Sequence, residues 1–164
     1  MTQPNGLEKI RHPVDDNKVC RRRALDILSR REHSRLELER KLLDRGFQEE
    51  MVDDVLNSLQ ADKLLDEGRF LESFIRARAG KGHGPARIEA DLSQRGIDSG
   101  RARSWLQDAD LNWLSLAAGV REKRFGPGCP KSFEDRCRQA KFLQYRGFDS
   151  EQINAALEFS DESD

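Results

Sequence analysis

The sequence predicts an all-α protein built from three tandem three-helix repeats. Residues that favour strands are scarce: the 164 residues include one Thr, one Tyr, five Val and six Ile. Leu, Arg, Glu and Ala, which favour helices, are abundant. The hexapeptide Leu-x-x-Arg-Gly-apolar occurs three times, spaced by 50 and 51 residues, at Leu42–Phe47, Leu92–Ile97 and Leu143–Phe148. A repeat of this period indicates stacked helical units, which we expect to form an elongated, curved array.

The composition favours a folded protein with a large surface. Charged residues make up 36% of the chain, yet 29 Lys and Arg nearly cancel 30 Asp and Glu. Disorder requires low hydrophobicity together with high net charge, and the net charge is only -1. No apolar run approaches a membrane span, residues 1–17 lack the apolar region of a secretory signal, and three cysteines cannot all pair. We therefore expect a cytoplasmic monomer that does not contact membranes.

The first repeat is expected at 20–65, after a flexible N-terminal segment at 1–19. Its first helix is marked by the apolar residues Ala24, Leu25 and Leu28. Ser34 and Glu37 have the spacing of a capping box, which opens the second helix. The third helix carries a buried apolar stripe of Met51, Val52, Val55, Leu56 and Leu59.

The second repeat is expected at 66–109. Asp66 is suited to cap its first helix, whose apolar face consists of Phe70, Leu71, Phe74 and Ile75. Pro85 suits the first turn of the helix that follows.

The third repeat is expected at 110–158, followed by an acidic tail at 159–164. Its first helix should run from Trp113 to Phe125. Glycine and proline at 126–130 then break the chain before a helix that begins near Ser132.

Each hexapeptide is interpreted as the end of a helix. Its glycine (Gly46, Gly96 or Gly147) supplies the left-handed conformation that commonly terminates helices. The preceding arginine lies in the last turn, where positive charge complements the helix dipole. The apolar residue after the glycine is expected to cover the helix end.

No catalytic or metal-binding motif is present. The histidines His12, His33 and His83 are not spaced as pairs, and the sequence contains no HExxH, GxSxG or Walker A motif. We expect a protein that is not an enzyme and that holds neither a metal nor a cofactor.

The loop Gly80–Pro85 (GKGHGP) has three interpretations: a phosphate-binding loop, a hinge between two helices, and a contact to the acidic surface of a partner. Its glycines precede a helix, where backbone N–H groups could hold a phosphate, but it lacks the Walker A order and a preceding strand. The interpretation we favour is a mobile hinge between two helices.

Basic clusters are the strongest functional signal. The window 74–88 contains four Lys or Arg and no acid, and the window 121–146 contains eight against three acids. Such sorting of charge indicates either a solvated face or contacts to DNA phosphates or an acidic protein surface. The candidate binding residues are Arg76, Arg78, Lys81, His83, Arg87, Lys123, Arg124, Lys131, Arg136 and Arg138. Arg21–Arg23 form a third cluster.

Aromatic side chains could stack on bases, but their helical spacing favours the core for Trp105, Trp113, Phe125 and Phe142. Tyr145, beside Arg146 at a predicted turn, is the exception.

The sequence resembles the RecX family of bacterial regulators of the RecA recombinase. The resemblance is carried by Leu65–Arg78 (LDEGRFLESFIRAR) and Gly80–Ile97 (GKGHGPARIEADLSQRGI), and by segments near Ala24–Leu42 and Lys141–Phe148. It covers about residues 20–158.

The resemblance implies binding in the helical groove of the RecA–single-stranded-DNA filament. Filament growth, ATP hydrolysis, strand exchange and co-protease activity would fall, which limits recombination and the SOS response. Some family members also bind DNA, so single- or double-stranded DNA is a second candidate partner. The competing hypothesis is a helical DNA-binding module that acts without RecA; the near-neutral net charge argues against it.

Overall fold

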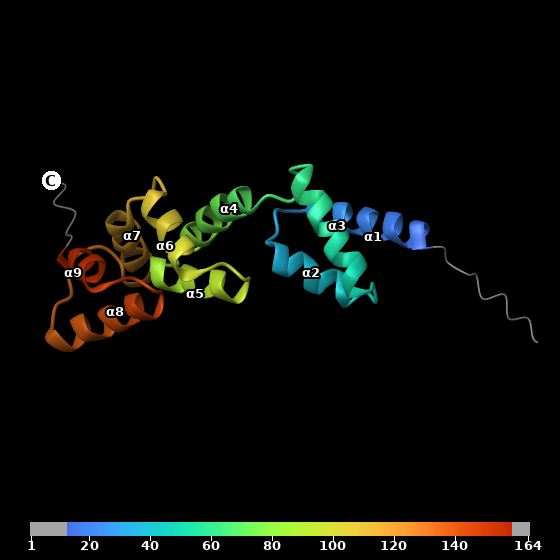
Figure 1. Ribbon diagram of the computed structural model, residues 1–164. Helices are drawn as coiled ribbons and strands as arrows, with labels where there is room; N and C mark the ends of the chain where they lie inside the picture. The colour runs from blue at the N-terminus through green and yellow to red at the C-terminus, as the bar shows by residue number, and fades with distance from the viewer. Residues whose placement is uncertain (1–12, 159–164) are drawn as a thin grey trace, which may run out of the picture. The chain divides into compact units, whose positions relative to one another are not determined.

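The computed structural model describes residues 13–158, which form nine α-helices and no strand (Figure 1). In chain order they are α1 (Pro13–Leu28), α2 (Arg35–Leu43), α3 (Glu49–Ala61), α4 (Glu67–Gly80), α5 (Pro85–Gln94), α6 (Ser99–Asp108), α7 (Trp113–Phe125), α8 (Phe133–Tyr145) and α9 (Ser150–Glu158). This confirms the all-α prediction and the three-helix repeat. None of these helices is long and apolar enough to cross a membrane.

The N-terminal boundary differs from the expectation. Helix α1 begins at Pro13, so the last part of the segment 1–19 that was expected to be flexible is helical. Proline fits the first turn of a helix, because its missing N–H needs no partner there. The helix that begins at Pro13 continues through Cys20 and Ala24, which are buried in the core. Residues 1–12, and the acidic tail at 159–164, lie outside the described residues.

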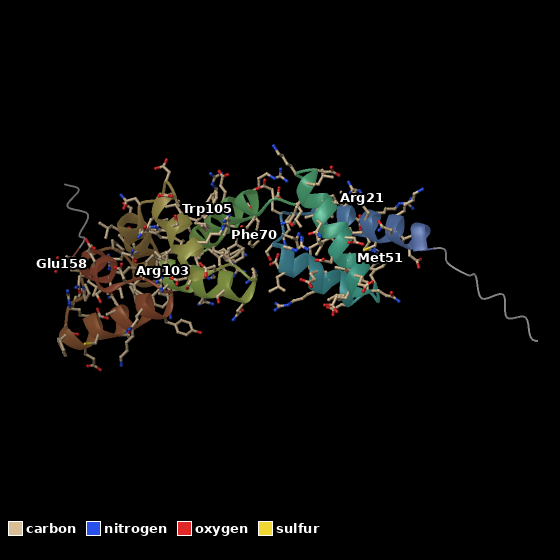
Figure 2. All side chains as sticks on the ribbon, viewed as in Figure 1. Arg21, Met51, Phe70, Arg103, Trp105 and Glu158 are labelled. Atoms are coloured by element: carbon tan, nitrogen blue, oxygen red, sulfur yellow. The ribbon has the colours of Figure 1, made fainter. Side chains whose placement is uncertain are left out.

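The chain divides into two compact units, residues 1–67 and 68–164. In the first unit, α1 and α2 both pack against α3. The apolar faces of the three helices enclose one core, formed by Cys20, Ala24, Ile27, Leu38, Leu42, Val52, Val55, Leu56, Leu59 and Leu65. Arg21, labelled in Figure 2, ties α1 to the end of α3 by donating hydrogen bonds to Ser58 Oγ and Asp62 Oδ2, both at 2.8 Å.

The second unit contains α4–α9 and two cores that meet. The first lies among α4, α5 and α6, and includes Phe70, Leu71, Ile75, Ile88, Leu92 and Leu106. The second lies among α7, α8 and α9, and includes Ala117, Leu143, Phe148, Ala156 and Leu157. Trp113 and Leu116, at the start of α7, pack against both cores. The second and third repeats therefore share apolar contacts.

The three hexapeptides form the same helix end. Gly46, Gly96 and Gly147 have φ of 87°, 81° and 97°, which is the left-handed conformation predicted for them. In each hexapeptide the glycine N–H donates to the carbonyl three residues before it, and the following apolar residue donates to the hexapeptide leucine, as from Ile97 to Leu92 at 3.1 Å. These paired bonds are the Schellman motif, which satisfies carbonyls that the helix leaves unpaired.

The helix starts are capped less uniformly. Ser34 and Glu37 form the predicted capping box at α2. Asp98 caps α6 through its side chain, and Asp149 accepts from Gln152 N at 2.8 Å at the start of α9. Gln48, at the matching position before α3, makes no side-chain capping bond.

Candidate functional site

The glycine-rich loop after α4 is a helix end of the same kind as the hexapeptides. Gly82 has φ of 85°, and its N–H donates to Ala79 O at 2.9 Å. The His83 N–H donates to Arg78 O at 3.1 Å, which completes a fourth Schellman motif.

The same loop is fastened to the third hexapeptide. The Gly84 N–H donates to Arg146 O at 2.8 Å, and the Ala86 N–H donates to Gly147 O at 3.0 Å. A phosphate bound at the start of α5 would need free backbone N–H groups there. The N–H groups of Gly84 and Ala86 already donate to the third hexapeptide, which argues against the phosphate-binding interpretation. These bonds also show an anchored turn where the sequence suggested a mobile hinge.

Two glycine backbones lie against each other at this junction. A Cβ on Gly84 would clash with the backbone of Gly147 and Phe148. A Cβ on Gly147 would lie 2.5 Å from Arg87 N. Both positions therefore require glycine, and their contact holds the second repeat against the third.

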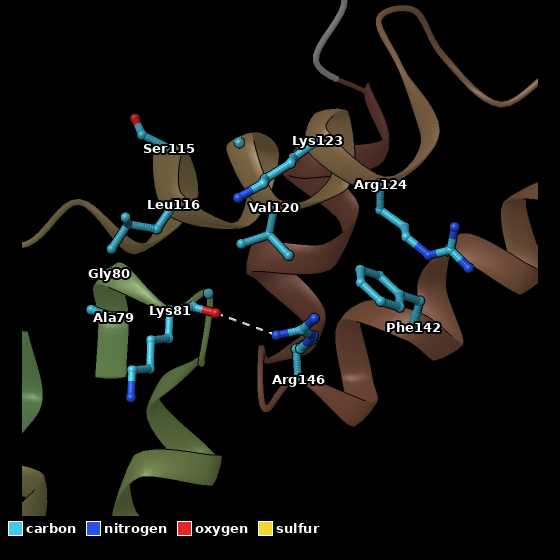
Figure 3. Close-up of a pocket in the computed structure, with 12 residues that line it drawn as sticks. Ala79, Gly80, Lys81, Ser115, Leu116, Val120, Lys123, Arg124, Phe142 and Arg146 are labelled. Atoms are coloured by element: carbon cyan, nitrogen blue, oxygen red, sulfur yellow. Dashed lines mark hydrogen bonds between the residues drawn. The ribbon is translucent and has the colours of Figure 1, made fainter. Parts of the chain in front are cut away.

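A pocket of about 510 Å³ opens beside this junction (Figure 3). Three segments line it: the end of α4 with the following turn, one face of α7, and α8. Its cationic residues are Lys81, Lys123, Arg124 and Arg146, and its apolar floor includes Leu116, Val120 and Phe142. No carboxylate is among the described residues that line it. We call this site the basic pocket.

Aromatic rings hold the arginines of the basic pocket. The guanidinium carbon of Arg146 lies 5.2 Å from the centroid of the Phe142 ring, and that of Arg124 lies 6.0 Å from it. Phe125 meets Phe142 edge-on, with centroids 5.3 Å apart. Arg146 also donates to Lys81 O at 3.3 Å, shown as the dashed line in Figure 3. Stacked guanidiniums are pre-organised to bind anions through their N–H groups.

The basic pocket brings together only part of the predicted set. Lys81 from the second repeat lines the same pocket as Lys123 and Arg124 from the third. Arg138 lies in an adjoining hollow with Arg124, where it stacks on Phe125 at 5.4 Å and pairs with Asp135 at 2.7 Å.

The other predicted residues lie outside the pocket lining. Arg76 pairs with Glu72 at 3.3 Å, and Arg78 pairs with Asp91 at 3.6 Å. Arg87 lies 5.6 Å from the centroid of the Tyr145 ring, and Arg136 pairs with Glu158 at 3.8 Å. Lys131 is exposed in the turn before α8.

His83 is partly buried and is not a charged group of the binding site. Its ring is half-buried and its Nδ1 is buried without a hydrogen-bond partner. Burial, followed by the positive charges of Arg87 and Arg78, lowers its pKa. We therefore expect a neutral imidazole at physiological pH, which contributes no charge to the basic pocket.

Sequence reasoning missed one residue of the site. Arg146 lies within the basic window 121–146 but outside the predicted set of binding residues. Its neighbour Tyr145 is 78% exposed, as expected, while Trp105, Trp113 and Phe142 pack against the cores. Phe125, for which the spacing also favours the core, is half-buried against Phe142 and belongs to neither core of the second unit.

The described residues form no cluster of metal-binding side chains. Among residues 13–158, no three His, Cys, Asp or Glu side chains gather where they could hold a metal ion. The arrangement is that of a binding surface, with fixed positive charge around an apolar floor.

Comparisons with known proteins match a single family over most of the chain. Three family models match: the first three-helix domain of RecX at residues 20–59, the second at 66–104 and the third at 113–157. The Regulatory protein RecX of Halorhodospira halophila is 47% identical over 148 residues, covering 90% of this chain and 92% of that protein. The Regulatory protein RecX of Pseudomonas entomophila is 42% identical over 144 residues, covering 88% and 93%.

A solved structure shows the same fold. The crystal structure of RecX from Lactobacillus salivarius superimposes with a TM-score of 0.74 at 24% identity, covering 87% of this chain and 95% of that one. Because three family models match successive repeats and the curated relatives align over nearly their whole length, the chain belongs to the RecX family of regulatory proteins.

Proposed function

We propose that this protein is a negative modulator of RecA. It binds the RecA–single-stranded-DNA filament in the cytoplasm and inhibits filament growth, ATPase, strand exchange and co-protease activity, which limits recombination and the SOS response. The observation that carries the proposal is the match of all three RecX domain models along the chain.

The charge distribution supports binding to a filament. The whole chain is close to neutral, with a net charge of -1, yet four basic residues line one pocket. Local charge of this kind favours a complementary surface, while low net charge limits non-specific attachment to DNA. Three repeats allow several modest contacts along one filament, which add as avidity.

The first test is an order-of-addition experiment on RecA ATPase. RecA and single-stranded DNA are titrated with the full chain before and after filament assembly. We expect the ATPase rate to fall in both cases, and to fall at a lower concentration before assembly if filament growth is the step blocked. An unchanged rate in both orders, with the protein shown to be folded, would contradict the proposal.

A second test separates the basic pocket from the α4 face. Lys81→Glu and Lys123→Glu reverse two charges at the pocket, and Arg76→Glu reverses an exposed charge elsewhere in the same unit. We expect the pocket variants to weaken RecA inhibition by about tenfold each, which corresponds to a coupling of about 1.4 kcal/mol with an acidic partner. A comparable loss for Arg76→Glu would assign part of the binding to the α4 face, where the basic window 74–88 also predicts a contact.

The competing function is DNA binding without RecA. Binding to single- and double-stranded oligonucleotides is measured in the absence of RecA at increasing salt. Tight binding that weakens steeply with salt would favour a DNA-binding module, because phosphate contacts release counterions.

A further inference from the structure

We infer that the basic pocket binds an acidic peptide segment of a partner protein, with one bulky apolar side chain on its floor and carboxylates on its rim. The inference does not depend on which protein is regulated, because it rests on the chemistry of the pocket.

The floor of the pocket accounts for the apolar side chain. Leu116 and Val120 of α7 and Phe142 of α8 present hydrocarbon to a hollow of about 510 Å³. That volume lies in the range of pockets that enclose small ligands, and it can hold a large side chain with its neighbouring backbone. A ligand held by charge alone would leave this apolar floor in contact with water.

The rim of the pocket accounts for the carboxylates. Lys123 provides an ammonium group, and Arg124 and Arg146 provide guanidiniums stacked near Phe142. Lys81 lines the pocket at the turn after α4, where its carbonyl accepts a hydrogen bond from Arg146. A planar guanidinium binds a carboxylate through two parallel hydrogen bonds, and stacking reduces the entropy lost when it does so. Among the described residues, no acid lines the rim, where it would repel such a ligand.

The rings favour a peptide over a nucleic acid. Single-stranded nucleic acids bind by stacking bases on exposed aromatic faces. Phe142 is half-buried, with the guanidiniums of Arg124 and Arg146 and the edge-on ring of Phe125 already around it. The exposed ring of Tyr145 does not line the pocket. The pocket therefore offers an apolar recess without a stacking platform.

Gly119 provides a variant that tests the recess directly. It lies on the exposed face of α7 and lines the pocket, and a Cβ built on it meets no atom within 4 Å. Gly119→Leu should place a branched hydrocarbon side chain in the pocket while leaving its basic residues unchanged. Gly119→Ala is the matched control, since it adds one methyl group and removes the same glycine from the helix.

The experiment measures fluorescence anisotropy of labelled probes with the full chain, in the absence of RecA. One probe is a twelve-residue peptide of Asp and Glu with a central Trp, the second replaces that Trp with Gly, and the third is an oligothymidylate. We expect the Trp peptide to bind about tenfold more tightly than the Gly peptide, which is the gain typical of burying one large side chain.

The variants have distinct expected effects. Gly119→Leu should weaken binding of the Trp peptide about tenfold, so that its affinity approaches that of the Gly peptide, whereas Gly119→Ala should bind as the parent does. Arg124→Glu should weaken binding of both peptides. Lys141→Glu makes the same change of charge sign on α8 outside the pocket lining and should change either affinity less than about threefold. Circular dichroism and thermal melting establish that each variant folds.

Three outcomes would overturn the inference. They are equal affinity for the two peptides, tighter binding of oligothymidylate that Arg124→Glu abolishes, and no binding of any probe by the folded protein. None of these measurements contains RecA, so their failure leaves the ATPase test of the proposed function unaffected.

Discussion

Gly147 meets two requirements at one position, whereas Gly46 meets one. Both have positive φ, at 97° and 87°. A Cβ on Gly46 would meet no atom within 4 Å, while a Cβ on Gly147 would overlap the backbone of Arg87. The same hexapeptide glycine thus ends a helix in the first repeat, and in the third it also forms the contact between repeats.

Gly147→Ala should therefore cost more stability than Gly46→Ala. A left-handed alanine costs about 1 kcal/mol, and forcing apart two packed backbones adds about 2 kcal/mol. We expect losses near 1 kcal/mol for Gly46→Ala and near 3 kcal/mol for Gly147→Ala, measured by urea unfolding. Equal losses would show that the backbone at the junction relaxes at little cost.

His33 links stability to pH through its buried ring. The residue is 1% exposed, its Nδ1 lies 3.0 Å from Arg31 O, and its Nε2 lies 2.8 Å from Lys41 Nζ. A neutral ring that donates from Nδ1 and accepts from the lysine satisfies both contacts. Burial lowers the pKa of His33, and the hydrogen bond to the Arg31 carbonyl opposes it. The charges of Arg31 and Lys41 lower the pKa further, and the charge of Glu37 raises it.

Stability should fall as the pH falls below about 6.5, the ordinary pKa of histidine. The unfolded state then takes up a proton that folded His33 resists, so protonation favours unfolding until the pH reaches the lowered pKa of the folded state. His33→Gln should be less stable at pH 7.5 but should lose less stability between pH 7.5 and 5.5. His83, whose pKa is also lowered, contributes a slope of the same sign that remains in this variant. Identical pH slopes in both proteins would contradict the assignment.

At the scale of helices, the three repeats share the structure of their helix C-termini more than that of their helix N-termini. The position that opens the third helix of each repeat is occupied by Gln48, Asp98 and Asp149. The two aspartates accept backbone hydrogen bonds, and Gln48 does not. The backbone at Gln48 already has the extended conformation of a capping residue, with φ of -72° and ψ of 146°.

Gln48→Asp should consequently stabilise the protein by about 1 kcal/mol, the usual gain from a side-chain cap. The acidic group also complements the positive end of the α3 dipole. Urea unfolding of the first unit measures the gain, and Gln48→Ala, which cannot cap, should show none.

Local signals predicted the helices well. Ser34, Pro85 and the hexapeptide glycines act within a few residues of their own helix end, so their spacing in the sequence contains the information. The junction between Gly84 and Gly147 could not be predicted, because it joins residues that are distant in sequence and share no pattern. The basic window identified Lys123 and Arg124 because they are adjacent in sequence. The contact between Arg146 and the Lys81 carbonyl depends on the junction between the repeats.

At the scale of the whole molecule, three repeats form two units. The core of the first repeat shares no residue with the others, whereas Trp113 and Leu116 belong to both cores of the second unit. Both tryptophans, Trp105 and Trp113, lie in the second unit, so tryptophan fluorescence reports on that unit alone.

Leu56→Ala should separate the urea unfolding transitions of the two units. Leu56 is fully buried in the first core, and its truncation should cost about 3 kcal/mol. We expect the far-ultraviolet circular dichroism transition to broaden toward lower urea while the tryptophan transition keeps its midpoint. A parallel shift of both transitions would mean that the units unfold together.

The bonds from Gly84 and Ala86 to the third hexapeptide make the docking of the two repeats directly observable. Those two amide protons are protected only while the repeats are in contact, so their exchange with solvent deuterium measures the free energy of separating them. The basic pocket is lined from both sides of the same contact. Any ligand that occupies it should slow that exchange, and the degree of slowing gives its affinity without a label.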